Sequence, residues 1–117
     1  MLWENQSPLS SFPAQTVTPK NFSEYDGVIV QCVSSDQSVA ASFCFKGYGA
    51  SMFDYVNIPE GAYAFTSARR FSFTDEGIVF DGGDQLGWHG HQEHSAKNNG
   101  VLKPLYIYGF KGVNGNV

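Results

Sequence analysis

Phe71-Ser-Phe-Thr-Asp-Glu-Gly-Ile-Val-Phe80 is the stretch that decides the fold. Its centre, Thr74–Gly77, suits a type I turn, in which Gly77 supplies the left-handed residue of a following bulge. Two short strands therefore run antiparallel on either side of the turn. The apolar side chains that then close on a shared core are Phe71, Phe73, Ile78 and Phe80. The stretch predicts a β-hairpin.

Apolar patterns on both sides of this hairpin predict further strands. Tyr25–Val33 is apolar on both faces, which is typical of a strand in the middle of a sandwich. Residues 38–46 alternate cleanly, with Phe43 and Phe45 on one face and Cys44 on the other, and this alternation predicts a half-buried strand. The remaining segments that we expect to form strands are Leu2–Val17 in short pieces, Met52–Ile58, Ala62–Phe73 and Val101–Phe110, the last with Pro104 near a sheet edge or a bulge.

The composition supports an all-β domain. Of 117 residues, 18 are aromatic, and Gly 13 with Pro 5 supplies many turns. Aromatic and β-branched side chains suit pleated, half-buried surfaces better than helices. A chain of this length holds one small core. We expect an antiparallel β-sandwich, jelly-roll-like, over residues 1–111, followed by a frayed tail over residues 112–117.

The charge balance argues against a polyanionic partner. Lys+Arg 7 against Asp+Glu 11 gives a net charge of -4, and the only adjacent cations are Arg69 and Arg70. We expect this pair to form cross-strand ion pairs, and we expect no binding of nucleic acid. No run of about 18 apolar residues predicts membrane insertion, and the start of the chain does not resemble a signal peptide.

Two cysteines, Cys32 and Cys44, fall within predicted strands. They could face each other across a hairpin and form a bridge, but two cysteines are too few for a disulfide scaffold. Buried free thiols are therefore the prediction.

Residues 81–100 are polar and rich in glycine and contain every histidine of the chain. We expect one long loop or a loosely paired hairpin with a broad tip. An aromatic ring surrounded by carboxylate, amide and imidazole groups is what a sugar ligand needs, since the ring stacks on the sugar and the polar groups bind its hydroxyls. The residues of this predicted ligand-binding site are Trp88, His89, His91, Asp84 and Gln85. The alternative is that Trp88 packs on the core or against a neighbouring subunit.

The histidines raise two metal hypotheses. His89 and His91 point the same way in an extended segment, so three copies on a three-fold axis would present six imidazoles to an octahedral metal ion. A zinc site from His89, His91 and His94 with Glu93 as base lacks the spacing of a zinc protease. We predict no catalytic residues and no cofactor apart from the possible axial metal.

A second aromatic group occurs among glycines before the predicted hairpin. It consists of Tyr48, Met52, Phe53 and Tyr55. Tyrosine, phenylalanine and methionine are enriched at subunit interfaces, so these residues are candidates for an oligomer interface. The alternative is a loop that covers the core.

Four stretches of the chain resemble a known family. Residues 1–17, with Leu-Trp-x-Asn-x-Ser-Pro followed by Phe-x-Ala-Gln-Thr-Val, are similar to the opening of small modules in tail proteins of phages and prophages of Gram-positive bacteria. Residues 25–30, 68–80 and 98–111 match in the same order. The matching motifs are strand cores and turns, and the match departs from residue 84 to residue 94.

This resemblance implies a virion tail component of the fibre, baseplate or receptor-binding type. It further implies a homotrimer that contacts other tail proteins and, in many cases, host cell-wall carbohydrate. The expected function is non-enzymatic, in host adsorption or tail architecture, with assembly in the host cytoplasm. The alternative from another class is a stand-alone carbohydrate-binding module, and a small metal-dependent hydrolase is a third, weaker hypothesis.

Overall fold

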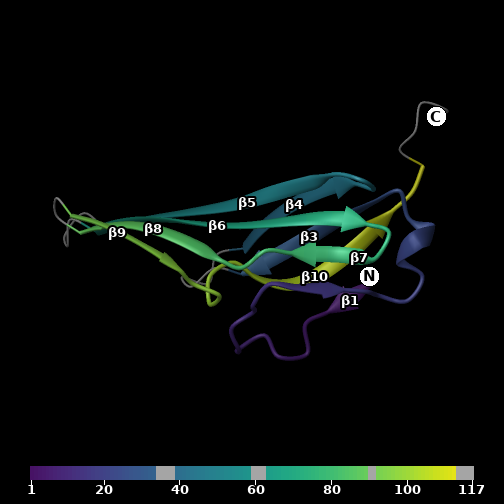
Figure 1. The fold of residues 1–117 in the computed structure, drawn as a ribbon, viewed down its shortest axis with the longest axis horizontal. Coiled ribbons are helices and arrows are strands. Elements are labelled where there is room, and N and C mark those ends of the chain that lie inside the picture. The colour runs from purple at the N-terminus through teal and green to yellow at the C-terminus, as the bar shows by residue number, and fades with distance from the viewer. Residues whose placement is uncertain (34–38, 59–62, 90–91, 113–117) are drawn as a thin grey trace.

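The computed structural model describes residues 1–33, 39–58, 63–89 and 92–112. It is an antiparallel β-sandwich of two sheets (Figure 1), which confirms the predicted fold class. A single 3-10 turn, η1 (Phe22–Glu24), interrupts the strands among the described residues. The strands are β1 (Trp3–Glu4), β2 (Gln15–Val17), β3 (Gly27–Val33), β4 (Val39–Phe45), β5 (Gly49–Ile58), β6 (Tyr63–Thr74), β7 (Gly77–Phe80), β8 (Asp84–His89), β9 (Gln92–Lys97) and β10 (Lys103–Phe110).

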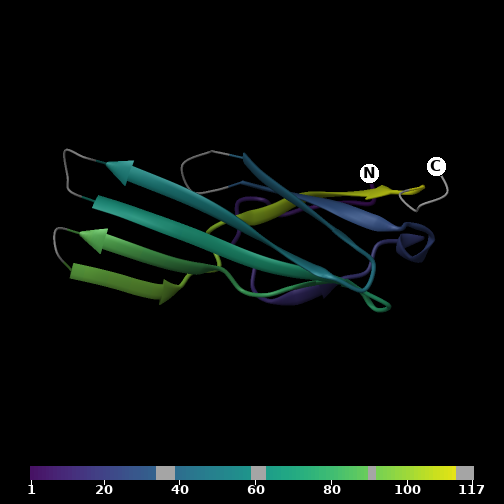
Figure 2. The same ribbon diagram turned by 90° about the horizontal axis from the view of Figure 1, so that it is seen from above.

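The two sheets differ in length. One has four strands in the order β1-β10-β3-β4, and the other has six strands with β6 as its longest member. β5 pairs with one side of β6; on the other side, β7 pairs with residues 71–74 and β8 with residues 63–68. The half of the larger sheet that contains β8 and β9 therefore projects beyond the four-stranded sheet (Figure 2). The molecule is accordingly elongated, 51 × 31 × 20 Å.

The β6–β7 hairpin forms where the sequence predicts it. Phe73 pairs with Ile78 and Thr74 with Gly77, without a register shift, so the turn consists of two residues and is tighter than the bulged turn that we expected. Gly77 has a φ of 135°, and a Cβ at this position would lie 2.4 Å from the carbonyl oxygen of Val17. Both the conformation and the close approach of β2 require glycine here.

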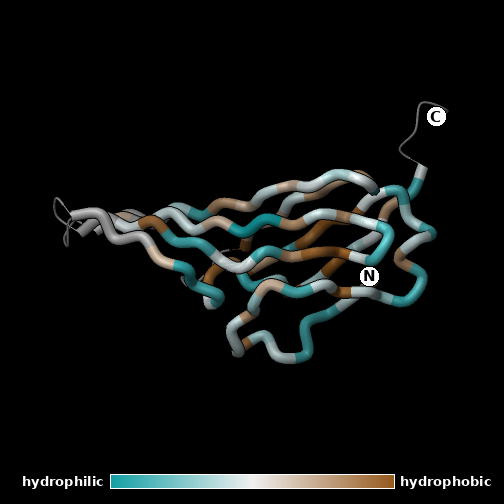
Figure 3. Tube along the Cα trace, in the orientation of Figure 1, coloured by the Kyte–Doolittle hydropathy of each residue, from teal (hydrophilic) through white to brown (hydrophobic). Residues whose placement is uncertain are grey.

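The core lies where the two sheets overlap, and apolar stretches of β3, β6, β7 and β10 meet there (Figure 3). Aromatic rings fill much of it: the Phe12 ring meets the Phe80 ring edge-on at 5.3 Å between centroids. Burying each such side chain stabilises the fold by about 1.5–3 kcal/mol. The buried apolar residues of this cluster are Phe12, Val17, Val28, Val30, Cys32, Cys44, Met52, Phe71, Phe73, Ile78, Phe80, Leu102 and Ile107.

β4 is half-buried, as its alternation predicts. Phe43 and Phe45 face solvent, whereas Cys44 is buried and Ala40 packs against the core. Phe73 of the other sheet belongs to the same buried cluster as Cys44, so small side chains on the inner face of β4 leave room for its ring. The structure therefore leaves an aromatic surface outside, on the four-stranded sheet.

Arg69 does not form the ion pair that we expected. Its side chain is only 1% exposed, and its guanidinium donates five hydrogen bonds of 2.9–3.3 Å to backbone carbonyl oxygens. The guanidinium has five N–H groups, so every donor is satisfied without a carboxylate. Burial lowers the pKa of Arg69. The accepting carbonyls belong to Phe12, Asp81, Asn99, Val101 and Leu102. Arg69 thus ties three separate loops to the inner face of β6.

Both cysteines are free and buried, as predicted. Cys32 lies opposite Ala40 and Cys44 lies opposite Val28 in the β3–β4 pairing, so the two thiols do not face each other. Burial raises the pKa of Cys32 to about 12, although the nearby charge of Arg69 acts in the opposite direction. Burial also raises the pKa of Cys44.

Two local expectations about the C-terminal third are confirmed. Residues 84–89 and 92–97 pair as strands β8 and β9, so the paired alternative holds for the described residues rather than one long loop. The pairing of β10 with β3 shifts register between Pro104 and Tyr106, so the proline lies at a bulge. The predicted frayed tail, residues 112–117, lies outside the described residues except for Gly112. No helix of the described residues has the length and apolar character needed to span a membrane.

Candidate functional site

The residues of the predicted sugar site are spread along β8. Asp84 is the first residue of this strand, Gln85 is the second, and the backbones of Trp88 and His89 lie at its end. At about 3.4 Å per residue, the positions span roughly 17 Å. His91 lies outside the described residues. Because side chains alternate along a strand, Asp84 and Gln85 point to opposite faces of the sheet, so the predicted residues do not converge at one point.

Asp84 and Gln85 both have partners within the hairpin region. The Asp84 Oδ1 atom accepts a hydrogen bond of 2.6 Å from Lys97 Nζ across the β8–β9 pairing. The Gln85 Oε1 atom accepts one of 3.2 Å from Asn98 Nδ2. The hydrogen bond from Lys97 to Asp84 raises the pKa of Lys97, which keeps its ammonium group protonated. The pair is exposed, so its carboxylate can accept and its ammonium group can donate further hydrogen bonds at the surface.

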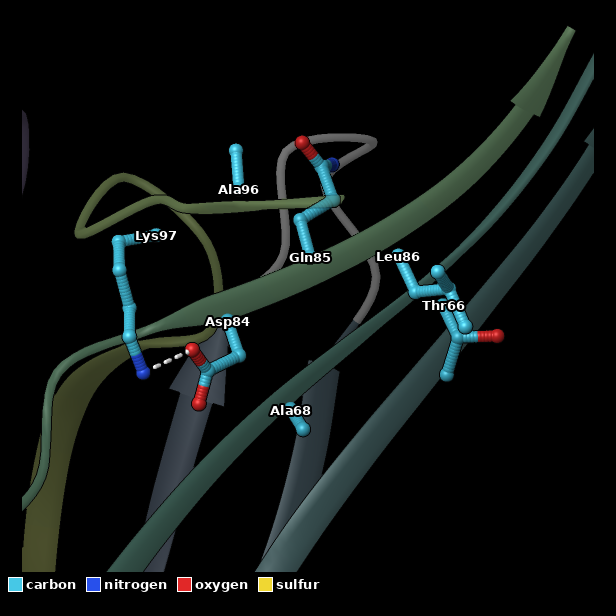
Figure 4. A pocket seen from close by; sticks show the side chains of 7 residues that line it. All are labelled: Thr66, Ala68, Asp84, Gln85, Leu86, Ala96 and Lys97. Atoms are coloured by element: carbon cyan, nitrogen blue, oxygen red, sulfur yellow. Dashed lines mark hydrogen bonds and ion pairs between the residues drawn. The ribbon is translucent and has the colours of Figure 1, made fainter. Parts of the chain in front are cut away.

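A shallow trough of about 580 Å³ lies beside the Asp84–Lys97 pair, over β6, β8 and β9 (Figure 4). Its lining is mainly apolar. The residues that line it are Thr66, Ala68, Asp84, Gln85, Leu86, Ala96 and Lys97. Sequence reasoning found Asp84 and Gln85 of this set and missed the others, because their contribution depends on which strands pair.

The trough results from a difference in side-chain size between neighbouring strands. On the outer face of the six-stranded sheet, Ala68 lies between Phe53 of β5 and Asp84 of β8. One row further along, Thr66 lies between Tyr55 and Leu86. Cross-strand neighbours have Cβ atoms about 5 Å apart, so small residues on β6 leave a hollow between larger ones. The small residues at alternate positions of β6 were the sequence signal that could have indicated this hollow.

The second aromatic group divides between surface and core. Phe53 and Tyr55 are 67% and 66% exposed on the outer face of β5, and Tyr48 is 70% exposed in the turn before β5. Met52 is only 2% exposed and belongs to the core. Because side chains alternate along a strand, Met52 points away from its neighbour Phe53. The expectation that Met52 joins a surface with these aromatic residues is therefore wrong.

The exposed aromatic rings and the trough together form a surface with two chemical characters. Phe53 and Tyr55 offer apolar rings, and the Asp84 carboxylate and the Lys97 ammonium group offer polar atoms across the hollow. A flat apolar face with hydroxyl groups around its rim, as in a sugar ring, is complementary to such a surface. We call Phe53, Tyr55 and the lining residues the trough face.

No group of three or more His, Cys, Asp or Glu side chains that could hold a metal ion occurs in the described part of the chain. The proposed axial metal site falls on His89, whose backbone ends β8, and on His91, which is outside that part. The hypothesis thus stays a prediction.

Comparisons of the chain with protein-family models, with curated proteins and with solved structures give no match.

Proposed function

We propose that the chain is a non-enzymatic component of a phage tail or baseplate that contributes to host adsorption through its trough face. The observation that carries this proposal is the pair of exposed rings, Phe53 and Tyr55, beside a hollow with a charged rim. Contiguous exposed apolar surface rimmed by polar residues marks binding sites in many proteins. The resemblance of four sequence stretches to phage tail modules supports the class.

The proposed ligand is host cell-wall carbohydrate. Sugar rings stack on Phe53 and Tyr55, while their hydroxyl groups bind to Asp84 and Lys97. Asp84 can accept further hydrogen bonds, since a carboxylate has about four acceptor sites and the Lys97 bond occupies one. We further propose that the chain acts as a homotrimer with other tail proteins as neighbours. Several copies on one particle can bind the same cell wall together, which raises the apparent affinity above that of one copy.

Retention on purified cell walls of the bacterium that carries the gene tests this proposal. The double variant Phe53→Ala, Tyr55→Ala should bind at least about tenfold more weakly, because each lost ring removes a stacking contact. Tyr48→Ala is the matched control, since Tyr48 is equally exposed but lies outside the trough, and its binding should match the unmodified protein. Equal retention of the double variant and the unmodified protein would refute the adsorption role. Trp88→Ala, measured alongside, tests the predicted part of Trp88 separately.

A stand-alone carbohydrate-binding module is the second candidate, since the same trough face favours it. Antibodies against the chain distinguish the two in preparations of phage particles from that strain. Label on particle tails supports the tail component. Cell-wall retention without any label on particles supports the stand-alone module instead.

A further inference from the structure

The outer face of the four-stranded sheet carries a second exposed apolar surface, separate from the trough face. Cross-strand pairing places its residues side by side: Phe43 lies opposite Ile29, which in turn lies opposite Tyr108. Val39 and Phe43 are 59% and 58% exposed, and the other members are more than a third exposed. We call the following residues the aromatic face: Ile29, Val39, Phe43, Phe45 and Tyr108.

Ring contacts hold much of this face in place before anything binds. The centroid of the Phe45 ring lies 6.0 Å from that of Phe43 and 5.8 Å from that of Phe110, each nearly perpendicular. Phe43 and Phe110 are 6.4 Å apart. Side chains that are already ordered lose little rotamer entropy when a partner covers them, so such a face is well suited to association.

The face is also uncharged. The outward positions of β3 and β4, at alternate residues from Gly27 to Val33 and from Val39 to Phe45, contain no Asp, Glu, Lys or Arg. The chain as a whole has a net charge of -4, so two copies repel each other wherever acidic surfaces meet. An uncharged face is where copies can approach without this repulsion, whereas a strongly charged partner would find nothing complementary on it.

The amount of exposed apolar surface matches what association needs. With aromatic side chains offering about 150–250 Å² and aliphatic ones somewhat less, the five residues leave on the order of 400 Å² of apolar surface in water. A standard interface covers about 800 Å² per partner, of which roughly 60% is apolar. The aromatic face therefore supplies most of the apolar area of one such interface.

We infer that copies of this chain associate through the aromatic face of the four-stranded sheet. The inference rests on the oligomeric part of the proposed function, and it leaves the trough face of every copy free for a ligand. It replaces the interface expected from the sequence, since Phe53 and Tyr55 lie on the opposite sheet.

Light scattering of the purified chain, at concentrations up to about 100 µM where a micromolar association is saturated, tests this inference. We expect a mass of two or three chains of 12.8 kDa each, because two copies can meet face to face or three copies can turn this face towards a common axis. The double variant Phe43→Thr, Phe45→Thr should have the mass of a single chain. The matched control Phe53→Thr, Tyr55→Thr changes two rings on the other sheet that are even more exposed, and it should keep the mass of the unmodified protein.

The outcomes separate the two proposals. A single-chain mass for the unmodified protein overturns both the oligomer and the inference, and leaves the aromatic face to a different protein. Alternatively, the oligomer dissociates in the Phe53, Tyr55 variant and persists in the Phe43, Phe45 variant. That result confirms that copies associate but overturns the assignment of the interface to the aromatic face. Cell-wall retention is measured on the same samples, so loss of adsorption is recorded independently of the mass.

Single cysteine substitutions keep the test valid even if the double variant fails to fold. Ala41 is exposed on the aromatic face, and Ser51 is exposed on the outer face of β5. A short bismaleimide should join copies of Ala41→Cys and should leave Ser51→Cys as single chains, because the native thiols are buried. Cross-linking of Ser51→Cys in place of Ala41→Cys contradicts the inference.

Discussion

The two outer faces of the sandwich use the same residue types in different ways. On the four-stranded sheet, Phe43, Phe45 and Phe110 contact one another edge to face, and the outward positions of β3 and β4 contain no charged residue. On the six-stranded sheet, small residues of β6 separate Phe53 and Tyr55 from the charged pair of Asp84 and Lys97. Contiguous rings form a surface that a flat apolar partner can cover. Separated rings with a polar rim form a surface that recognises a ligand with both characters.

The largest expected effect is a loss of stability on the inner side of the six-stranded sheet, beneath the trough face, where Arg69 holds three loops. Arg69→Met leaves five backbone carbonyls without their donor, and we expect the free energy of unfolding to fall by about 3–5 kcal/mol. Urea denaturation followed by circular dichroism measures this loss. Arg70→Met, at the next position and exposed, should change the value by no more than about 0.5 kcal/mol. Equal effects at both positions would contradict the structural role of Arg69.

The next largest effect is a pH dependence of stability on the inner side of the four-stranded sheet, where Cys32 is buried. The pKa of the Cys32 thiol is raised from 9.0 to about 12, so the folded state keeps a proton that the unfolded state loses in this interval. The resulting stability is complete below pH 9 and is lost as the pH rises towards 12, at about 1.4 kcal/mol per pH unit.

Paired denaturation curves of the unmodified protein and Cys32→Ala check this pH dependence. The variant lacks the titrating thiol. At pH 7 its free energy of unfolding should be lower than that of the unmodified protein because of the cavity, and this difference should shrink between pH 9 and pH 11. The comparison of the two proteins removes the contribution of other alkaline titrations. Curves that stay parallel over this range would show that Cys32 is not protected from ionisation.

The smallest effect makes the trough face more like the aromatic face. Asp84→Asn removes one charge of the exposed pair with Lys97, and exposed pairs contribute little to stability. We expect the midpoint of thermal unfolding to move by no more than about 2 °C, and the mass in solution to stay unchanged. Cell-wall retention should weaken, because the carboxylate on the rim is gone. A large stability loss would mean that Asp84 serves the fold instead of a ligand.

The β6–β7 hairpin could be predicted from the sequence because its information is local. Its apolar residues alternate on both sides of a turn with a glycine, and Gly77 takes the positive φ that the turn requires. The faces of β4 could not be predicted in the same way. Alternation separates Phe43 from Cys44, but which of them faces inward depends on Phe73 in the opposite sheet, and no pattern within β4 contains that information.

Arg69 and the trough face show the same dependence on distant segments. Two adjacent arginines on a strand indicate ion pairs, yet the carbonyls that surround Arg69 come from loops as far away as Phe12. Likewise, Asp84 was found as a polar residue in a polar stretch, but the hollow beside it requires β6 and β5 to be in register with β8. Pairing between strands that are far apart in the chain creates the site.

Because the two sheets differ in length, the two ends of the molecule's long axis differ in structure. β1 and the end of β10 lie beside each other, since Trp3 pairs with Ile107, and the projecting β8–β9 hairpin lies at the far end of the long axis (Figure 1). A label joined before β1 or after β10 would consequently sit near one pole and leave the projecting β8–β9 hairpin at the other pole unobstructed.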